Sequence, residues 1–196
     1  MSNYRTIREI STAFDNFYLR RGYRALEPVK ITSKVDKSVY LTNSATNLFK
    51  QYFGTQEWLC ARQRSMRTQI LGNYYDPMSE TEFPSYFVSF GAFVSPDSLQ
   101  RLIDDTIEFH KGIGFRSDRM RFRISEKETL LSSYANASAL SGNIWQDSRD
   151  EKYDHVYGAG LRGRAIKLDY FQENIERYKN LGYFLTICRE TKQHTG

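Results

Sequence analysis

Helix-like and strand-like patterns alternate along this chain, and that alternation constrains the fold more than any other feature of the sequence. In residues 6–21 apolar side chains recur at intervals of three and four, which predicts a helix with one buried face that ends at Gly22. Residues 119–124 alternate charged and apolar side chains with a period of two, which predicts a half-buried strand with one basic face. Helices interleaved with antiparallel strands favour an α+β fold.

The remaining segments extend the same pattern. A turn within residues 43–50 should open into a short helix, and residues 59–70 and 85–94 are expected to form a long hairpin. Ser95 followed by Pro96 is a strong helix start, and that helix should run to Gly112. Two further strands are expected at residues 165–171 and 181–189.

Composition limits the class of protein. The chain has 196 residues, of which 40% are hydrophobic and 26% charged, so it can bury a core, and wholesale disorder is excluded. Neither a linker nor a repeat divides it, which predicts a single domain over residues 1–196. No apolar run approaches the roughly 18 to 20 residues of a membrane helix, and the first residues do not resemble a signal peptide. We therefore expect a cytoplasmic protein with no membrane partner.

The number and spacing of cysteines and histidines, and the net charge, limit the kinds of ligand that the chain is expected to bind. Cys60 and Cys188 are too few for a disulfide framework, and the three histidines lack ligand spacing, so we expect reduced thiols and no structural metal. Lys and Arg number 28 against 23 Asp and Glu, a mild excess that suits a polyanion such as a nucleotide or RNA. The 14 Tyr and 13 Phe could stack on bases, although most should fill the core and the strand faces.

Three segments, in order along the chain, resemble a known family. The first is Tyr-Leu-Thr-Asn-Ser-Ala-Thr-Asn-Leu-Phe-Lys at residues 40–50, followed by Phe53 and Gly54. It is similar to motif 1 of the catalytic domain of alanyl-tRNA synthetase, a class II aminoacyl-tRNA synthetase. The shared features are a Thr-Asn pair and the pattern Asn-x-Phe-Lys. The alternative for this segment alone is an ordinary strand, turn and helix.

The second segment resembles class II motif 2. Gln-Arg-Ser-Met-Arg at residues 63–67 is similar to the start of that motif, and Ser-Tyr-Phe-Val-Ser-Phe-Gly-Ala-Phe at residues 85–93 is similar to its end. Adenylate formation needs a fixed cation on the α-phosphate while a carboxylate attacks, and an arginine supplies both charge and geometry. The resemblance therefore implies that Arg67 is catalytic, that Arg64 and Arg67 bind ATP, and that Phe87 stacks on adenine. The alternative is a basic strand paired with an aromatic core strand.

The third segment is Asn-Ile-Trp-Gln at residues 143–146, similar to the family's Asn-Phe-Trp, whose tryptophan lines the amino-acid pocket. Residues 178–184 resemble the family strand that carries Trp-Asn-x-Val-Phe. The resemblance implies that Asn43, Trp145 and Asn180 bind a small amino acid, with ATP and Mg²⁺ as cofactors. It also implies a class II aminoacyl-tRNA synthetase-like antiparallel β-sheet flanked by helices.

The departures from the family pattern are informative too. The family's glutamate in motif 2 falls on Val88, and its basic loop is replaced at residues 68–76. Lys167 stands where a carboxylate is expected near the metal, which exchanges an oxygen ligand for a cation that could pair with phosphate. The chain ends before motif 3 is expected, although residues 158–162 could be a shortened version.

The glycines at 158, 160 and 163 match a dinucleotide pattern only by accident, because a strand follows them. Three nearby arginines form either a solvated basic loop or an anion clamp: Arg149, Arg162 and Arg164.

Two functions from different classes follow. The first is activation of a small amino acid with ATP, whose acceptor is a tRNA end, a carrier protein or a small molecule. The second is a paralogue that does not form adenylates but binds an aminoacyl-tRNA end, a nucleotide or a protein partner. A third alternative is an unrelated α+β domain with chance matches. The alanyl-type domain does not depend on a motif 1 dimer, so we expect a monomer.

Overall fold

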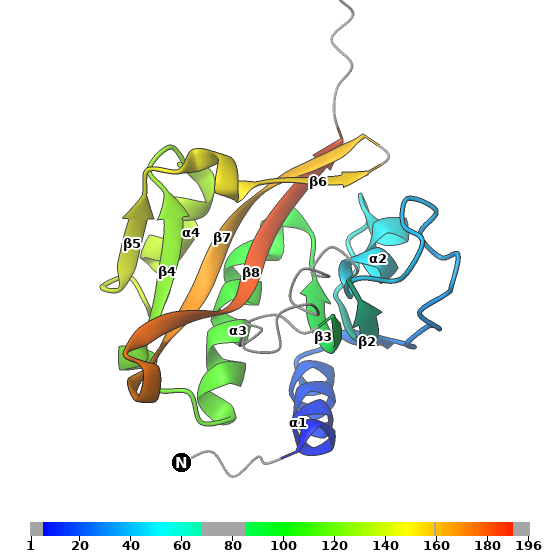
Figure 1. Cartoon of the computed structure of the whole chain (residues 1–196), viewed down its shortest axis with the longest axis horizontal. Helices are drawn as coiled ribbons and strands as arrows, with labels where there is room; N and C mark the ends of the chain where they lie inside the picture. The colour runs from blue at the N-terminus through cyan, green and yellow to red at the C-terminus, as the bar shows by residue number, and fades with distance from the viewer. Residues whose placement is uncertain (1–5, 68–84, 159, 190–196) are drawn as a thin grey trace, which may run out of the picture. The chain divides into compact units, whose positions relative to one another are not determined.

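The computed structural model describes residues 6–67, 85–158 and 160–189. These residues form two compact units, which divide between Ser95 and Pro96, and each unit is built around its own sheet (Figure 1). The elements are mixed α and β with mostly antiparallel strand pairs flanked by helices, which confirms the α+β class. A single domain over residues 1–196 stays a prediction.

The N-terminal unit, Thr6–Ser95, contains a three-stranded sheet. Its order is β1-β2-β3, with β1 parallel to β2 and β3 antiparallel to β2. The pairing of β2 and β3 confirms the predicted hairpin partners within the described residues, which leave out 68–70. The elements of this unit are α1 (Ile7–Arg20), β1 (Arg24–Leu26), α2 (Thr46–Phe49), a 3-10 turn (Lys50–Tyr52), β2 (Leu59–Met66) and β3 (Tyr86–Phe93).

Local sequence explains the first helix. The Thr6 hydroxyl accepts the backbone N–H of Glu9, and the Glu9 carboxylate accepts the backbone N–H of Thr6, so a capping box starts the helix. Gly22 lies just beyond the last turn with a φ of 88°, a backbone conformation that glycine adopts without steric cost. The predicted helix over residues 6–21 is confirmed.

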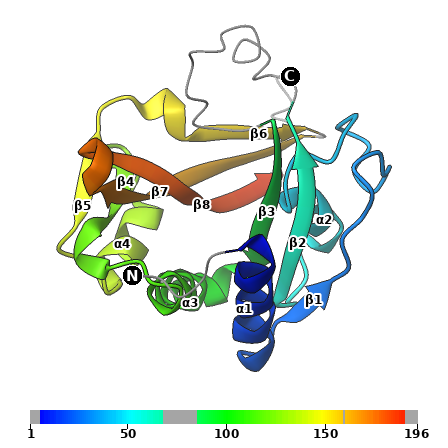
Figure 2. The ribbon, with the colours of Figure 1, turned by 60° about the horizontal axis from the view of Figure 1, so that its bottom comes forward.

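Helices cover both faces of this sheet (Figure 2). On one face, the Phe14 ring of α1 lies 5.0 Å from the Phe90 ring of β3. On the other face, α2 approaches so closely that a Cβ added to Gly91 would lie 2.8 Å from the Cβ of Ala45 and 2.9 Å from the Phe49 ring. The glycine of the motif 2-like segment is therefore explained by helix packing.

The second unit begins at Pro96 and contains a five-stranded sheet. β8 pairs with β7 along its whole length, while β4 and β6 pair with different ends of β7, and β5 lies beside β4. The elements of this unit are α3 (Leu99–Gly112), β4 (Met120–Ser125), α4 (Leu130–Ala137), β5 (Ile144–Asp147), β6 (Asp154–Gly158), β7 (Leu161–Gln172), β8 (Arg177–Arg189) and short 3-10 turns at Pro96–Ser98, Ser117–Arg119, Asp150–Tyr153 and Glu173–Ile175.

The core of the second unit lies on one face of its sheet. Apolar side chains of α3 and α4 pack there against β4, β7 and β8, and both helices are seen on the same side of the sheet in Figure 2. Phe122 and Ile166 are fully buried in this core. Because side chains alternate along a strand, Arg121 and Arg123 point to the other face, which confirms the predicted basic face.

Some elements differ from expectation. The helix expected from Ser95 begins as a 3-10 turn at Pro96–Ser98 and becomes α-helical at Leu99. Four elements were not predicted, namely β1, α4, β5 and β6. Each has three to eight residues, which is too short for a clear hydrophobic period. None of the helices described is long and apolar enough to cross a membrane.

Candidate functional site

Three of the predicted site residues meet at the end of β2. Arg67 follows the strand directly, and its backbone N–H donates to the Ser85 carbonyl at 2.8 Å. Its side-chain Nε donates to the backbone carbonyl of Asn43 at 3.3 Å, and its guanidinium lies 5.0 Å from the centre of the Phe87 ring. Asn43, Arg67 and Phe87 therefore form one cluster, in which a cation is oriented by a carbonyl and an aromatic ring.

Asn47 fixes the backbone that holds Arg67. Its side-chain oxygen accepts the backbone N–H groups of Asn43 at 2.9 Å and Ser44 at 3.0 Å. Its amide nitrogen donates to the Asp36 carboxylate at 2.7 Å, and Asn47 itself is buried. The second asparagine of the motif 1-like segment therefore shapes the turn that presents the Asn43 carbonyl.

Asp36 anchors the same turn. Burial alone would raise the pKa of this carboxyl, but hydrogen bonds from Lys50, Ser38 and Asn47 outweigh it and lower the pKa to about 2. The Lys50 ammonium lies 2.7 Å from the carboxylate. Asn47 and Lys50 belong to the motif 1-like segment, but their partner Asp36 lies outside it and was not predicted.

The structure does not bring Arg64 to this cluster. Side chains alternate along β2, so Gln63 and Ser65 face α2 while Arg62 and Arg64 face α1. Ser65 is directly opposite Phe87 in the β2–β3 register, and Arg64 is opposite Val88. The two arginines predicted to bind ATP therefore lie on different faces of the sheet.

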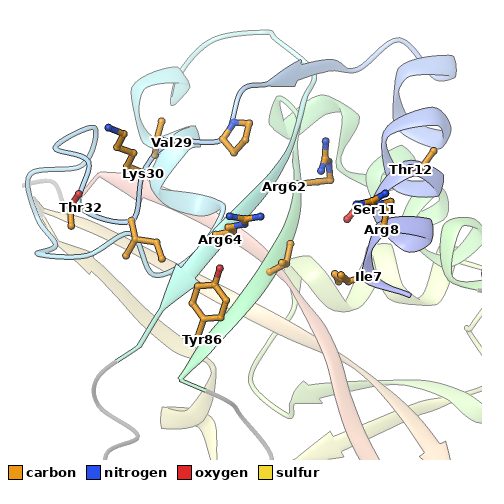
Figure 3. A pocket seen from close by; sticks show the side chains of 13 residues that line it. Ile7, Arg8, Ser11, Thr12, Val29, Lys30, Thr32, Arg62, Arg64 and Tyr86 are labelled. Carbon is orange, nitrogen blue, oxygen red and sulfur yellow. The ribbon is translucent and has the colours of Figure 1, made fainter. Parts of the chain in front are cut away.

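Arg64 lines a groove of about 840 Å³ instead (Figure 3). One wall is the start of α1, the other is the segment at residues 28–32, and β2 and β3 form the floor. Four cations line this basic groove, which is defined by Arg8, Lys30, Arg62 and Arg64, together with apolar side chains such as Ile7 and Val88. Arg8 and Lys30 were not predicted, since neither lies in a motif and only the fold brings them together.

The cations of the basic groove differ in how they are compensated. Arg62 is bound by Asp15 of α1, with Nη2 2.8 Å from the carboxylate. Arg8, Lys30 and Arg64 form no ion pair with any residue in the described ranges 6–67 and 85–189 without 159. The groove therefore carries uncompensated positive charge along a partly apolar floor.

The other two predicted residues lie in the second unit, on the sheet face away from the helices. Trp145 on β5 is 39% exposed, and the Arg121 guanidinium lies 4.9 Å from its ring centre and 3.5 Å from that of Tyr178. Asn180 on β8 donates from Nδ2 to the Asp169 carboxylate at 3.3 Å and to the Gly182 carbonyl at 3.2 Å. Asn180 thus braces the irregularity in β7–β8 pairing at residues 168–169.

This sheet face is strongly cationic. We call it the open face and define it by Arg121, Arg123, Lys167 and Asp169, with Trp145 beside them. Within the described part of the chain no group of three His, Cys, Asp or Glu side chains could hold a metal ion. The donors here do not suit protein-bound Mg²⁺, because guanidinium and ammonium groups surround the one central carboxylate.

Two of the three arginines considered as an anion clamp are engaged with acids. Arg149 binds both carboxylate oxygens of Asp147 at 2.9 and 3.0 Å. Arg164 donates to three carboxylates: Glu128 at 2.9 Å, Asp150 at 2.7 Å and Asp154 at 2.8 Å. Arg149 and Arg164 therefore stabilise local structure through these pairs, while the solvated loop and the anion clamp both stay predictions.

Comparisons with known proteins add no relative. None of the protein-family models matches the chain, and no curated protein matches it significantly.

Proposed function

We propose that this chain activates a small amino acid with ATP, in a fold related to the class II aminoacyl-tRNA synthetases. A carboxylate oxygen of the amino acid attacks the α-phosphorus of ATP, the bond from that phosphorus to the bridging oxygen breaks, and pyrophosphate leaves. The product is an aminoacyl adenylate. The step develops negative charge on the α-phosphate, so it needs a cation fixed in place before the reaction.

The cluster of Asn43, Arg67 and Phe87 carries this proposal. The Asn43 carbonyl and the Phe87 ring orient the Arg67 guanidinium, and its two terminal nitrogens have no hydrogen bond to a described residue, so they can donate to phosphate. Phe87 offers an aromatic surface for adenine. The resemblance to the family assigns the amino acid to Trp145 and Asn180, which belong to the second unit, and it assigns Mg²⁺ to the ATP phosphates.

The test is amino-acid-dependent exchange of pyrophosphate into ATP, measured with each of the twenty amino acids. We expect exchange with a small amino acid and a rise in melting temperature with ATP and Mg²⁺. Arg67→Ala should lower the exchange rate by about 10² to 10³, as expected for loss of one preorganised charge-stabilising group. Arg20→Ala removes the same charge from the exposed last turn of α1 and should leave the rate unchanged.

Two outcomes contradict adenylation. One is the absence of exchange with all twenty amino acids together with no thermal response to ATP and Mg²⁺. The other is full exchange activity in Arg67→Ala, which would remove Arg67 from its assigned role.

The basic groove favours the second function, recognition of a tRNA acceptor end without adenylation. Its uncompensated cations suit phosphates, and the half-exposed Tyr86 ring at its floor could stack on a base. Fluorescence anisotropy with an acceptor-stem RNA tests this function. Arg8→Ala or Lys30→Ala should weaken binding and reduce the salt dependence by about one phosphate contact each, whereas Arg67→Ala should not.

A further inference from the structure

The open face of the five-stranded sheet holds more positive than negative charge. In the β4–β7 register Arg123 is opposite Lys167, and Arg121 is opposite Asp169. Residues directly opposite each other in an antiparallel pair share a face, so three cations and one carboxylate lie together.

Asp169 is shared by the two arginines. Its carboxylate lies 2.8 Å from Arg123 Nε and 3.7 Å from Arg121 Nε, and Arg123 Nη2 donates to it at 3.1 Å. Asn180 donates to the same carboxylate, which is 1% exposed. One buried carboxylate therefore faces two guanidiniums, and the negative charge of this cluster is smaller than its positive charge.

Lys167 is the cation without an acid. Its ammonium forms no ion pair with any residue that the structure describes, and it lies 4.8 Å from the ring centre of Tyr153 and 5.8 Å from that of Tyr183. The nearby Asp147 is occupied by Arg149 and by the hydroxyl of Tyr153. Burial first, and then the charge of Arg123, lower the pKa of Lys167, and the charges of Asp169 and Asp147 offset these effects only in part.

His155 on β6 supplies an independent observation beside Lys167. Its Nε2 is buried and has no hydrogen-bond partner among the described residues. Its ring lies 5.9 Å from that of Tyr183, which also borders the Lys167 ammonium. Buried polar atoms in native proteins are nearly always paired, and a bound polar group would give this nitrogen a partner in the region where the charge of Lys167 acts on His155.

We propose that the open face binds a phosphoryl group, which pairs with the Lys167 ammonium next to Arg123 and His155. Three cations against one carboxylate leave two positive charges, which match a phosphate dianion better than a single carboxylate. The buried Tyr153 ring lowers the local polarity on one side of the ammonium, which strengthens the pairing. This inference does not rest on adenylate formation, since inorganic phosphate is sufficient to test it.

The test is a titration of the full chain with inorganic phosphate at constant ionic strength, in which isothermal titration calorimetry measures the Kd. We expect saturable binding, and we expect Lys167→Met to weaken it at least tenfold. Lys111→Met is the matched control, because it removes the same charge from an exposed position near the end of α3 and should leave the Kd within twofold. A parallel titration with acetate should show binding at least tenfold weaker than phosphate.

Three results would overturn the inference: an unchanged Kd in Lys167→Met, an equal loss in Lys111→Met, or acetate binding as tight as phosphate. A second variant protects the test if Lys167→Met folds poorly. Lys167→Arg keeps the charge and should bind phosphate within about threefold of the parent chain, and loss of binding in a folded Lys167→Arg also counts against the site.

The imidazole of His155 provides a local readout. Phosphate should shift its side-chain NMR signals in the parent chain and not in Lys167→Met, whereas a ligand bound elsewhere would leave them unmoved in both. Phosphate binding without pyrophosphate exchange would leave this site standing and remove the adenylation proposal. Pyrophosphate exchange without a phosphate effect on the His155 signals would support adenylation and remove the phosphate site.

Discussion

The two sheets of this chain are covered differently, and the difference decides where chemistry can occur. The three-stranded sheet has α1 on one face and α2 on the other, so its central side chains are used for packing. Its candidate residues lie at the margins, with Arg67 past the end of β2 and Arg64 in the groove beside α1. The five-stranded sheet packs its described helices on one face only, and charged side chains occupy the middle of the other.

The largest expected difference between the two faces of the five-stranded sheet is at two neighbouring residues of β7. Ile166 is buried on the helix face, whereas Lys167 lies on the open face. Ile166→Ala should lower the free energy of unfolding by about 2 to 5 kcal/mol, since it leaves a cavity in the core. Lys167→Ala should change it by less than about 1 kcal/mol, because the ammonium contacts two rings but forms no ion pair with a described residue. Urea denaturation measures both, and equal losses would show that the open face is packed like the core.

Two glycines compare the sheets directly. A Cβ at Gly91 in β3 would collide with Ala45 and Phe49, whereas a Cβ at Gly182 in β8 meets no atom within 4 Å. Gly91→Ala should therefore destabilise the chain by about 1 to 3 kcal/mol through overpacking, and Gly182→Ala should lie within about 0.5 kcal/mol of the parent chain. Chemical denaturation of the two variants tests the claim, which fails if Gly91→Ala is as stable as Gly182→Ala.

Asp36 tests the margin of the three-stranded sheet. With a folded pKa of about 2, below its ordinary 3.8, this carboxyl stabilises the chain above about pH 4, and the contribution is lost as the pH falls toward 2. Asp36→Asn should cost about 1 to 3 kcal/mol at pH 7, because it removes the charge of a buried carboxylate that pairs with Lys50. The free energy of unfolding of this variant should also depend less on pH between pH 4 and pH 2. The same pH dependence in the variant and the parent chain would contradict the lowered pKa of Asp36.

The smallest expected effect concerns His155 on the other sheet. Burial first, and then the charge of Lys167, lower the pKa of His155 below 6.5. The folded chain therefore binds this proton less readily than the unfolded chain, and stability should fall as the pH drops through 6.5. Lys167→Met should raise the pKa of His155, although burial keeps it below 6.5. NMR titration of the imidazole measures the change, and an unmoved pKa would separate the two side chains.

Periodicity and short-range motifs predicted much of this architecture. The helix over α1, the pairing of β2 with β3 and the basic face of β4 follow from local patterns that buried contacts reinforce. The meeting of Arg67 with Phe87 was also predictable, since both belong to one motif 2-like hairpin. In contrast, the position of Lys167 beside Arg123 depends on strand register. The pairing of β4 with β7 places Asp169 opposite Arg121 and Lys167 opposite Arg123, which the sequence alone does not show.

Long-range assembly explains what the sequence could not predict. The basic groove draws Arg8, Lys30 and Arg64 from three separate segments, so no local pattern marks it. The separation of Arg64 from Arg67 follows from strand alternation, which a motif comparison by itself does not apply. α4 was missed because its eight residues are mostly small or polar and its packing uses few of them.

Arg164 connects the segments around the start of α4, the start of β6 and β7. Its guanidinium joins carboxylates from three segments, Glu128, Asp150 and Asp154, and Glu128 also accepts the backbone N–H of Leu131 at the start of α4. Many proteins gather three such acids around a divalent ion. Here the Arg164 side chain neutralises them, so we expect these segments to stay ordered when a chelator removes divalent ions.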